Sequence, residues 1–321
     1  MNFENKKLRR FSSLNGPSIR IAAIALVSLA TCPAKGWAVD FTPDTTRYLS
    51  DPSFLPLQGQ IFSETSYAHT DRTADFKFSN GATNEHLSGN GDHYSQSFAY
   101  GITDRLSVSA GGSYSDTTQH YSFAFGSPFS VGSSQFDNPS FAITYRAIEQ
   151  VDSPVSLDVK TSYSPAAVDQ TSQSGQIALF VNRELKLLTI QGEFGATYTD
   201  QYDGRQTSTA TDHGGFWSYL AGLRTQARLT DRFAVNSGVI WSKNSDISYE
   251  GQFFRDSSDG TWSPYVSLTY AVIPDHVDLT FEYDHDFVGD DHRTFSGAGF
   301  GNGKWANADE NLYAVHLRLL F

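Results

Sequence analysis

Four aspartates and one histidine in the stretch DHDFVGDDHRTF (284–295) are candidate oxygen and nitrogen ligands for a cation. Carboxylate oxygens are the ligands that hard divalent cations prefer. The spacing differs from the twelve-residue calcium loop, which needs alternating acids or amides, a central glycine and a closing glutamate. We interpret the stretch as solvated loop charge and predict no dedicated metal site. The side chains concerned are Asp284, Asp286, Asp290, Asp291 and His292.

Nucleophilic catalysis would need a serine, a histidine and an orienting acid within hydrogen-bond reach. His285 is the histidine to check, because it falls on the outward face near the top of its predicted strand. Serine is too abundant for one residue to stand out, and no GxSxG, GxxxxGK[ST], HExxH or paired CxxC motif occurs. The sequence predicts no catalytic residue and no cofactor, and hydrolysis is the least favoured function.

Charges of both signs also recur at every second position of several segments, on the side opposite the apolar residues. They suggest a polar pathway in which facing acidic and basic side chains orient a small solute. The alternative is that the charges pair across an interior and only fill it, as Arg228 and Asp278 would do near one end. The predicted inward-facing set is Arg146, Asp158, Lys160, Glu193, Arg224, Arg228, Asp278, Glu282, Asp284 and Arg318.

The elements that must position these charges are strands, because apolar and polar residues alternate with period two. Twelve segments of about ten residues show the pattern. They fall near 59–69, 93–102, 105–115, 139–148, 154–164, 174–183, 187–199, 215–229, 233–243, 261–273, 277–288 and 310–321.

The connections between these segments are short and long in turn. Short ones such as ITDR (102–105) and LTDR (229–232) alternate with long polar ones such as 70–92 and 289–309. This rhythm is typical of a transmembrane antiparallel up-and-down β-barrel, with short periplasmic turns and long extracellular loops. Strands in lipid must close into a ring, because each unpaired backbone group there costs several kcal/mol. A soluble β-sandwich is the alternative, but it requires neither the loop rhythm nor an export signal.

The last segment, ENLYAVHLRLLF, alternates up to a final aromatic residue. Tyr313 and Phe321 lie on its apolar side. This ending resembles the C-terminal signal by which the barrel assembly machinery recognises bacterial outer-membrane barrels, so the resemblance implies that machinery as a partner.

The first 38 residues read as a signal peptide, with a basic beginning, the apolar run IAAIALVSLA and small residues before a cleavage point after Ala38. Lipidation at Cys32, the single cysteine, is the less favoured alternative. Six of the 23 basic residues and one of the 35 acidic residues lie in this segment. The rest of the chain is therefore strongly acidic, which argues against nucleic acid as a partner and favours divalent cations that bridge it to lipopolysaccharide.

Two segments flank the predicted strands without a clear role. Residues 39–58 contain three prolines and either lie in the periplasm or fold into the barrel as a small plug. In the loop 116–138, Tyr121, Phe123 and Phe125 alternate, which predicts a strand that continues above the bilayer. These aromatic residues either form a lid over the mouth or, as we favour, pack in a β-hairpin extension.

The hairpins YGITDRLSVSAGGSY (100–114) and ARLTDRFAVNSGVIW (227–241) share a T-D-R turn between two strands. They resemble the turns of outer-membrane proteins associated with meta-pathway phenol degradation, which are often described as transporters. The resemblance covers these turns and the general layout, and it implies a conduit for small solutes, aromatic ones among them. Together the observations predict a barrel over 59–321 that acts as a narrow passive channel. A structural or adhesive barrel with a blocked lumen is the alternative.

Overall fold

The computed structural model describes residues 48–78, 81–124, 126–151, 153–167, 172–202, 212–245, 247–248, 254–295 and 303–321. The predicted signal peptide, Cys32 and residues 39–47 lie outside these ranges. No helix in the described part of the chain is long and apolar enough to cross a membrane.

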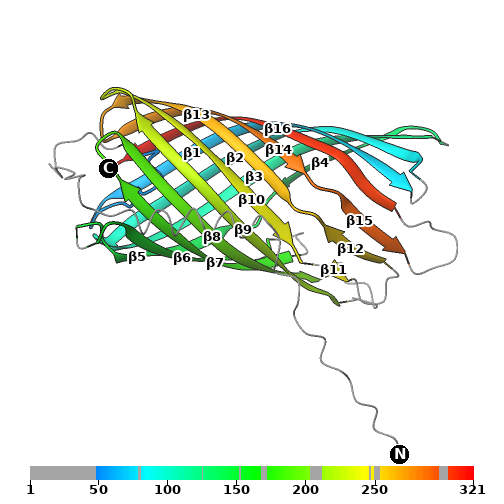
Figure 1. Ribbon diagram of the computed structural model, residues 1–321, viewed down its shortest axis with the longest axis horizontal. Coiled ribbons are helices and arrows are strands. Elements are labelled where there is room, and N and C mark those ends of the chain that lie inside the picture. Colours follow the sequence, from blue (N-terminus) through cyan, green and yellow to red (C-terminus); the bar gives the residue numbers. More distant parts are fainter. Residues whose placement is uncertain are drawn as a thin grey trace, which may run out of the picture.

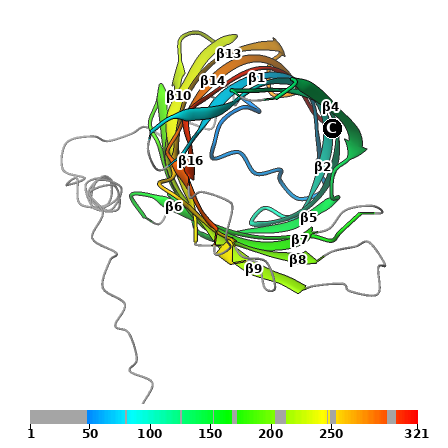
Figure 2. The same cartoon turned by 90° about the vertical axis from the view of Figure 1, so that its right-hand side faces the viewer.

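Twelve antiparallel strands form a closed ring, which confirms the predicted all-β barrel. Neighbours follow one another along the chain, and the ring closes where β16 pairs with β1 from Phe62↔Leu320 to Phe78↔Gly303. Figure 1 shows β1 and β16 side by side, and Figure 2 looks down the ring. The strands are β1 (Ile61–Phe78), β2 (Thr83–Thr103), β3 (Leu106–Phe123), β5 (Ser140–Ile148), β6 (Ser156–Ser164), β7 (Ser172–Glu184), β8 (Leu188–Tyr202), β9 (Asp212–Arg228), β10 (Phe233–Asn244), β13 (Thr261–Ile273), β14 (Val277–Val288) and β16 (Gly303–Leu320).

Several strands are longer than the ten residues predicted, and the excess lies at one end of the barrel. β2 has 21 residues, and β1 and β3 have 18 each. Short strands extend the sheet at this end, which we call the long-loop end; the opposite end, with the tight turns, is the short-turn end. The additional strands are β4 (Phe129–Phe136), β11 (Ile247–Ser248), β12 (Phe254–Ser258) and β15 (Asp291–Phe295).

The outside of the barrel is apolar and its inside is polar, the reverse of a soluble protein. Phe98, Ile143 and Phe281 are each more than half exposed, whereas Asp278, Thr280 and Gln226 are almost completely buried. Aromatic pairs lie on the outer face, such as Tyr67 with Tyr94 (ring centroids 5.1 Å apart) and Tyr283 with Tyr313 (5.3 Å). Large exposed apolar surface is unfavourable in water but matches lipid, and Tyr prefers the membrane interface. The chain is therefore a barrel of the outer membrane.

Candidate functional site

The chain that precedes β1 lies inside the barrel. Residues 48–57, here called the inner segment, run across the ring of strands at the short-turn end, and Figure 2 shows them in blue within the ring. Tyr48, Leu49, Asp51, Ser53 and Leu55 are each at most 4% exposed. The sequence left two locations open for this segment, the periplasm and the barrel interior. Its described residues occupy the barrel interior.

Asp51 is the centre of the contacts that hold the inner segment. Its Oδ2 accepts hydrogen bonds from Thr189 Oγ1 on β8 (2.8 Å) and from Arg228 Nη2 on β9 (2.9 Å). Its Oδ1 accepts from the backbone N–H of Ser53 (2.9 Å), which shapes a tight turn. The carboxylate is 1% exposed, so these partners replace the water it loses.

Further bonds tie the inner segment to β8 again and to two more strands. Gln191 on β8 donates to the carbonyl of Pro52 (2.5 Å), and Arg146 Nη2 on β5 donates to the carbonyl of Ser53 (2.7 Å). On β14, Asp278 Oδ2 accepts from the backbone N–H of Leu49 (2.6 Å). Because these strands surround the lumen, the segment is fixed from several sides.

Tyr48 anchors the beginning of the inner segment. Its ring packs with Ala234 and Ala271 on β10 and β13, and its hydroxyl donates to the carbonyl of Thr230 (2.5 Å). Burial, together with the negative charges of Asp278 and Asp231, raises the pKa of Tyr48 to about 12. The phenol therefore remains a donor at physiological pH.

A close backbone crossing fixes the other end of the segment. Gly59 N donates to Gly101 O (2.8 Å) and Gly101 N donates to Gln60 O (3.0 Å), so the chain runs along β2 before it enters β1. A Cβ at Gly101 would lie 1.9 Å from the carbonyl oxygen of Leu57. Only glycine leaves room for this crossing.

The suggested pair of Arg228 with Asp278 is wrong. Arg228 instead pairs with Asp51, and Asp278 accepts the backbone N–H groups of Leu49 and Ser50. The physical reason is that the inner segment lies between the two side chains and offers each a better partner. Alternation on β9 and β14 predicts which side chains face the lumen, but it gives no information on where the aperiodic inner segment lies.

Two of the predicted inward charges form a close pair with each other. Arg146 on β5 binds Asp158 on β6 through two bonds, from Nε to Oδ1 (2.8 Å) and from Nη2 to Oδ2 (3.0 Å). The residues are directly opposite in register, and both side chains are nearly buried. Asn182 on β7 also donates to Asp158 Oδ2 (2.9 Å). A two-bond geometry of this kind is the strong form of the Arg–carboxylate interaction.

Other pairs lie further from the inner segment. Arg224 on β9 pairs with Glu193 on β8 (Nη2 to Oε2, 2.9 Å) and stands 5.9 Å from the ring centroid of Tyr265. Arg318 on β16 pairs with Glu64 on β1 at the seam where the ring closes. Glu282 lies 3.9 Å from the imidazole of His316, and Oδ1 of Asp284 is buried without a hydrogen-bond partner among the described residues.

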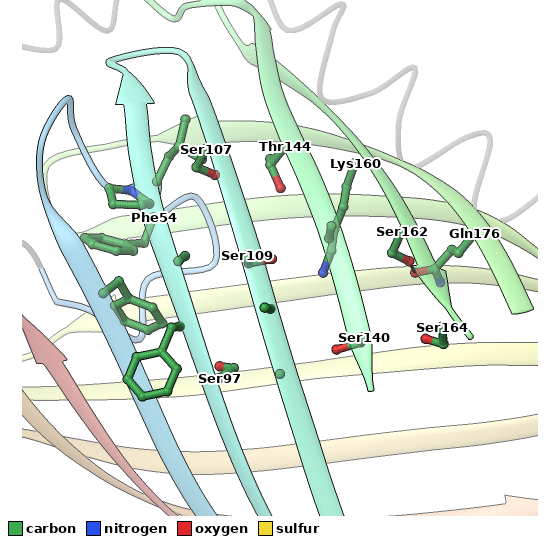
Figure 3. Close-up of a pocket in the computed structure, with 18 residues that line it drawn as sticks. Phe54, Ser97, Ser107, Ser109, Ser140, Thr144, Lys160, Ser162, Ser164 and Gln176 are labelled. Atoms are coloured by element: carbon green, nitrogen blue, oxygen red, sulfur yellow. Dashed lines mark hydrogen bonds between the residues drawn. The ribbon is translucent and has the colours of Figure 1, made fainter. Parts of the chain in front are cut away.

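Lys160 differs from the four arginines. No carboxylate in the described part of the chain lies within 4.0 Å of its ammonium group, and its register partners are the uncharged Thr144 on β5 and Ala178 on β7. It lines a cavity of about 460 Å³ on the β2–β7 side of the lumen. Figure 3 shows Lys160 among serine and threonine hydroxyls, with Phe54 of the inner segment at the other side.

The aromatic residues at the long-loop end pack within a hairpin. β4 pairs with β3 from Tyr114↔Phe136 to Tyr121↔Phe129, so the strand does continue above the barrel as predicted. Phe129 stacks on Tyr121 (4.9 Å) and on Phe123 (5.7 Å). Tyr121 also packs against a small cluster that contains Ala74, Leu87 and Ala308. Phe125 lies outside the described residues.

The final strand ends at the seam of the barrel. Phe321 exchanges two backbone hydrogen bonds with Ile61 (2.9 and 3.0 Å), while its side chain is 71% exposed on the outside. Tyr313 is half exposed on the same face and contacts Tyr283.

The loop acids are only partly brought together. Asp290 and His292 meet Asp259, and their ligand atoms lie within 4.8 Å of one another. Asp284 and Asp286 belong to β14 instead, and Lys304 pairs with Asp290. A cation would therefore compete with an ammonium group at this place.

The histidines do not assemble a nucleophilic triad in the described part of the chain. His285 lies 2.9 Å from Asn311 Oδ1, and no described serine is bonded to it. His93 does contact Ser115 Oγ (3.1 Å), but Asp137 accepts from Ser115 rather than orienting the imidazole. A triad needs the acid on the histidine, so this order of contacts does not activate a serine.

Sequence reasoning missed Asp51, Thr189, Gln191 and Glu64. For Glu64 a signal existed, because the first and last strands of a closed barrel must pair, and this register puts it opposite Arg318. For the residues around Asp51 there was none, since their role depends on where an aperiodic segment folds.

Comparisons with known proteins agree with the fold. No protein-family model matches the sequence. No curated protein matches it either. Among solved structures, the COG4313 outer membrane channel from Pseudomonas putida F1 is similar at a TM-score of 0.55 and 14% identity, over 86% of this chain and all of that one. The translocator domain of the autotransporter NalP from Neisseria meningitidis is similar at a TM-score of 0.51 and 11% identity, over 82% of this chain and 88% of that one. At such identities the likeness extends to the barrel fold.

Proposed function

We propose that the protein is a passive outer-membrane channel for small solutes, in which the inner segment narrows the periplasmic end of the lumen. The observation that carries the proposal is the polar cavity of about 460 Å³ beside the inner segment. Its wall on β2–β6 consists largely of serine, alanine and threonine, which leaves space inside the barrel. A barrel that serves only as a scaffold has no need of such a space.

The charged residues support a polar pathway in a specific way. Each of the four predicted arginines is paired with an acid. By contrast, Lys160 on β6 faces the lumen without an acid partner among the described residues. On β14, Glu282, Asp284 and Asp286 face the lumen without an arginine partner among those residues. β6 and β14 are six strands apart in the twelve-strand ring and so lie opposite each other. A solute between them experiences a transverse field that orients it.

A structural barrel with a blocked lumen is the competing function, and the many bonds of the inner segment favour it. The channel and the blocked barrel differ in their conductance. The chain without residues 1–38 is refolded, checked for heat-modifiable migration and measured in a planar bilayer, beside variants in which residues 48–57 are deleted or replaced by Gly and Ser. We expect small discrete steps from the parent and larger ones from both variants. Silence from all three folded barrels would reject the channel.

The proposed partners follow from this location. They are outer-membrane lipid, lipopolysaccharide bridged by divalent cations to the acidic loops, the barrel assembly machinery, and the transported solute. No catalytic step is part of the proposal.

A further inference from the structure

The cavity on the β2–β7 side of the lumen is amphipathic, with a charged end and an apolar end. At the apolar end, the rings of Phe54 and Phe62 lie 5.3 Å apart, and Leu55 and Pro56 complete the floor. At the other end stands Lys160, and serine and threonine hydroxyls line the wall between. A ligand that fits must therefore combine an apolar body with a group that accepts from an ammonium and from hydroxyls.

The ammonium group of Lys160 is available for a ligand. Its strand neighbours across the ladder are Thr144 and Ala178, which carry no charge. The inward-facing acid nearest in sequence, Asp158, already accepts two bonds from Arg146 and one from Asn182. The chain as a whole has a net charge of −12. Lys160 is the exception among the five predicted inward-facing cations, because Arg146, Arg224, Arg228 and Arg318 each pair with a carboxylate.

The size of the cavity narrows the ligand class. A volume of about 460 Å³ falls in the range of roughly 300–1,000 Å³ that is usual for small-molecule sites. We propose that this cavity is a binding site for a small organic monoanion, a carboxylate on a compact, flat apolar body, with Lys160 bound to the carboxylate and Phe54 and Phe62 packed on the body.

This inference rests on the proposed channel for its biological meaning, since it names the class of solute that would pause there. Its physical test is independent of conductance. Benzoate is a suitable probe, and benzyl alcohol is a neutral molecule of similar size. Binding is measured by saturation-transfer NMR on the folded barrel in detergent, with empty micelles as the blank.

The variant Lys160→Gln removes the charge, Lys160→Arg retains it, and Lys186→Gln removes a lysine charge from the exposed turn between β7 and β8 as the matched control. We expect saturable benzoate binding to the parent, to Lys160→Arg and to Lys186→Gln, and a dissociation constant roughly tenfold higher for Lys160→Gln, because a hydrogen bond to a charged group is lost. Benzyl alcohol is expected to bind weakly and without dependence on residue 160. The variant Phe54→Ala should weaken benzoate binding as well.

Equal benzoate binding to the parent and to Lys160→Gln, or no saturable binding to a folded parent barrel, would overturn the inference. In the latter case a conducting barrel would leave the channel proposal intact. Conversely, a silent barrel that binds benzoate through Lys160 would support the anion site and reject the channel.

Discussion

Arg228 on β9 and Asp51 of the inner segment lie 177 positions apart in the chain and are joined by a bond of 2.9 Å in the barrel interior. Both side chains are nearly buried, at 11% and 1% exposure. Removing one member of such a pair leaves an uncompensated charge, which costs about 3–5 kcal/mol. Loss of either partner therefore disfavours the position of the segment across the lumen.

Asp51→Asn is expected to release the inner segment without unfolding the barrel, because the strands keep their own hydrogen-bonded ring. The backbone amides of residues 49–51 and 53–55 should lose protection in hydrogen exchange, and channel conductance should rise. Asp116→Asn is the matched control, since Asp116 is exposed on β3 far from the segment. Unchanged protection of these amides in Asp51→Asn would show that the other bonds suffice.

The Arg146–Asp158 pair is expected to stabilise the barrel wall as well as the segment. Arg146→Met should lower the free energy of unfolding by about 3 kcal/mol, since Asp158 is then left buried beside Asn182 alone. The double variant Arg146→Met/Asp158→Leu should recover a large part of this loss, because no charge remains. Urea unfolding in lipid vesicles measures both. Additive losses in the double variant would contradict the coupling.

Ion selectivity should depend on the balance between Arg224 and Glu193. Arg224→Gln leaves the carboxylate of Glu193 in the lumen, so the permeability ratio should shift toward cations by about fivefold, equivalent to roughly 1 kcal/mol for a partly solvated charge. Arg224→Gln/Glu193→Gln should return the ratio close to that of the parent. Reversal potentials in a salt gradient give these ratios, and an identical ratio in all three proteins would place the pair away from the ion path.

The barrel itself was predictable because its physics is local and repetitive. Alternation in segments such as 277–288 follows from one face in lipid and one in the lumen, and β14 occupies these same residues. The interior was predictable only for partners on adjacent strands, as with Arg146 and Asp158. Contacts made by the inner segment depend on a long-range fold-back that no periodicity encodes, which is why the partner of Arg228 was misassigned.

Phe321 is proposed to act in assembly rather than in stability. Its backbone bonds to Ile61 do not need the side chain, which is largely exposed. Phe321→Ala should strongly reduce the amount of barrel inserted in cells while refolding into vesicles stays near that of the parent. Leu317→Ala, a lipid-facing change on the same strand, is the control. Equal insertion of Phe321→Ala and the parent would reject a role as signal.

Docking of the inner segment should be lost at high pH through Tyr48. The pKa of this phenol is raised from 10.0 to about 12 by burial and by the neighbouring carboxylates. A group whose pKa is higher in the docked state stabilises that state fully below the undocked pKa, and the contribution disappears as pH rises to the docked value. Protection of the segment against hydrogen exchange should therefore be constant up to pH 10 and fall between pH 10 and about 12.

In Tyr48→Phe the segment should be less protected at neutral pH, because the bond to Thr230 is lost, and the fall at high pH should be absent. Tyrosinate absorbance, read as the difference between parent and Tyr48→Phe, locates the titration, and a step near pH 10 would show that the hydroxyl is not buried as described.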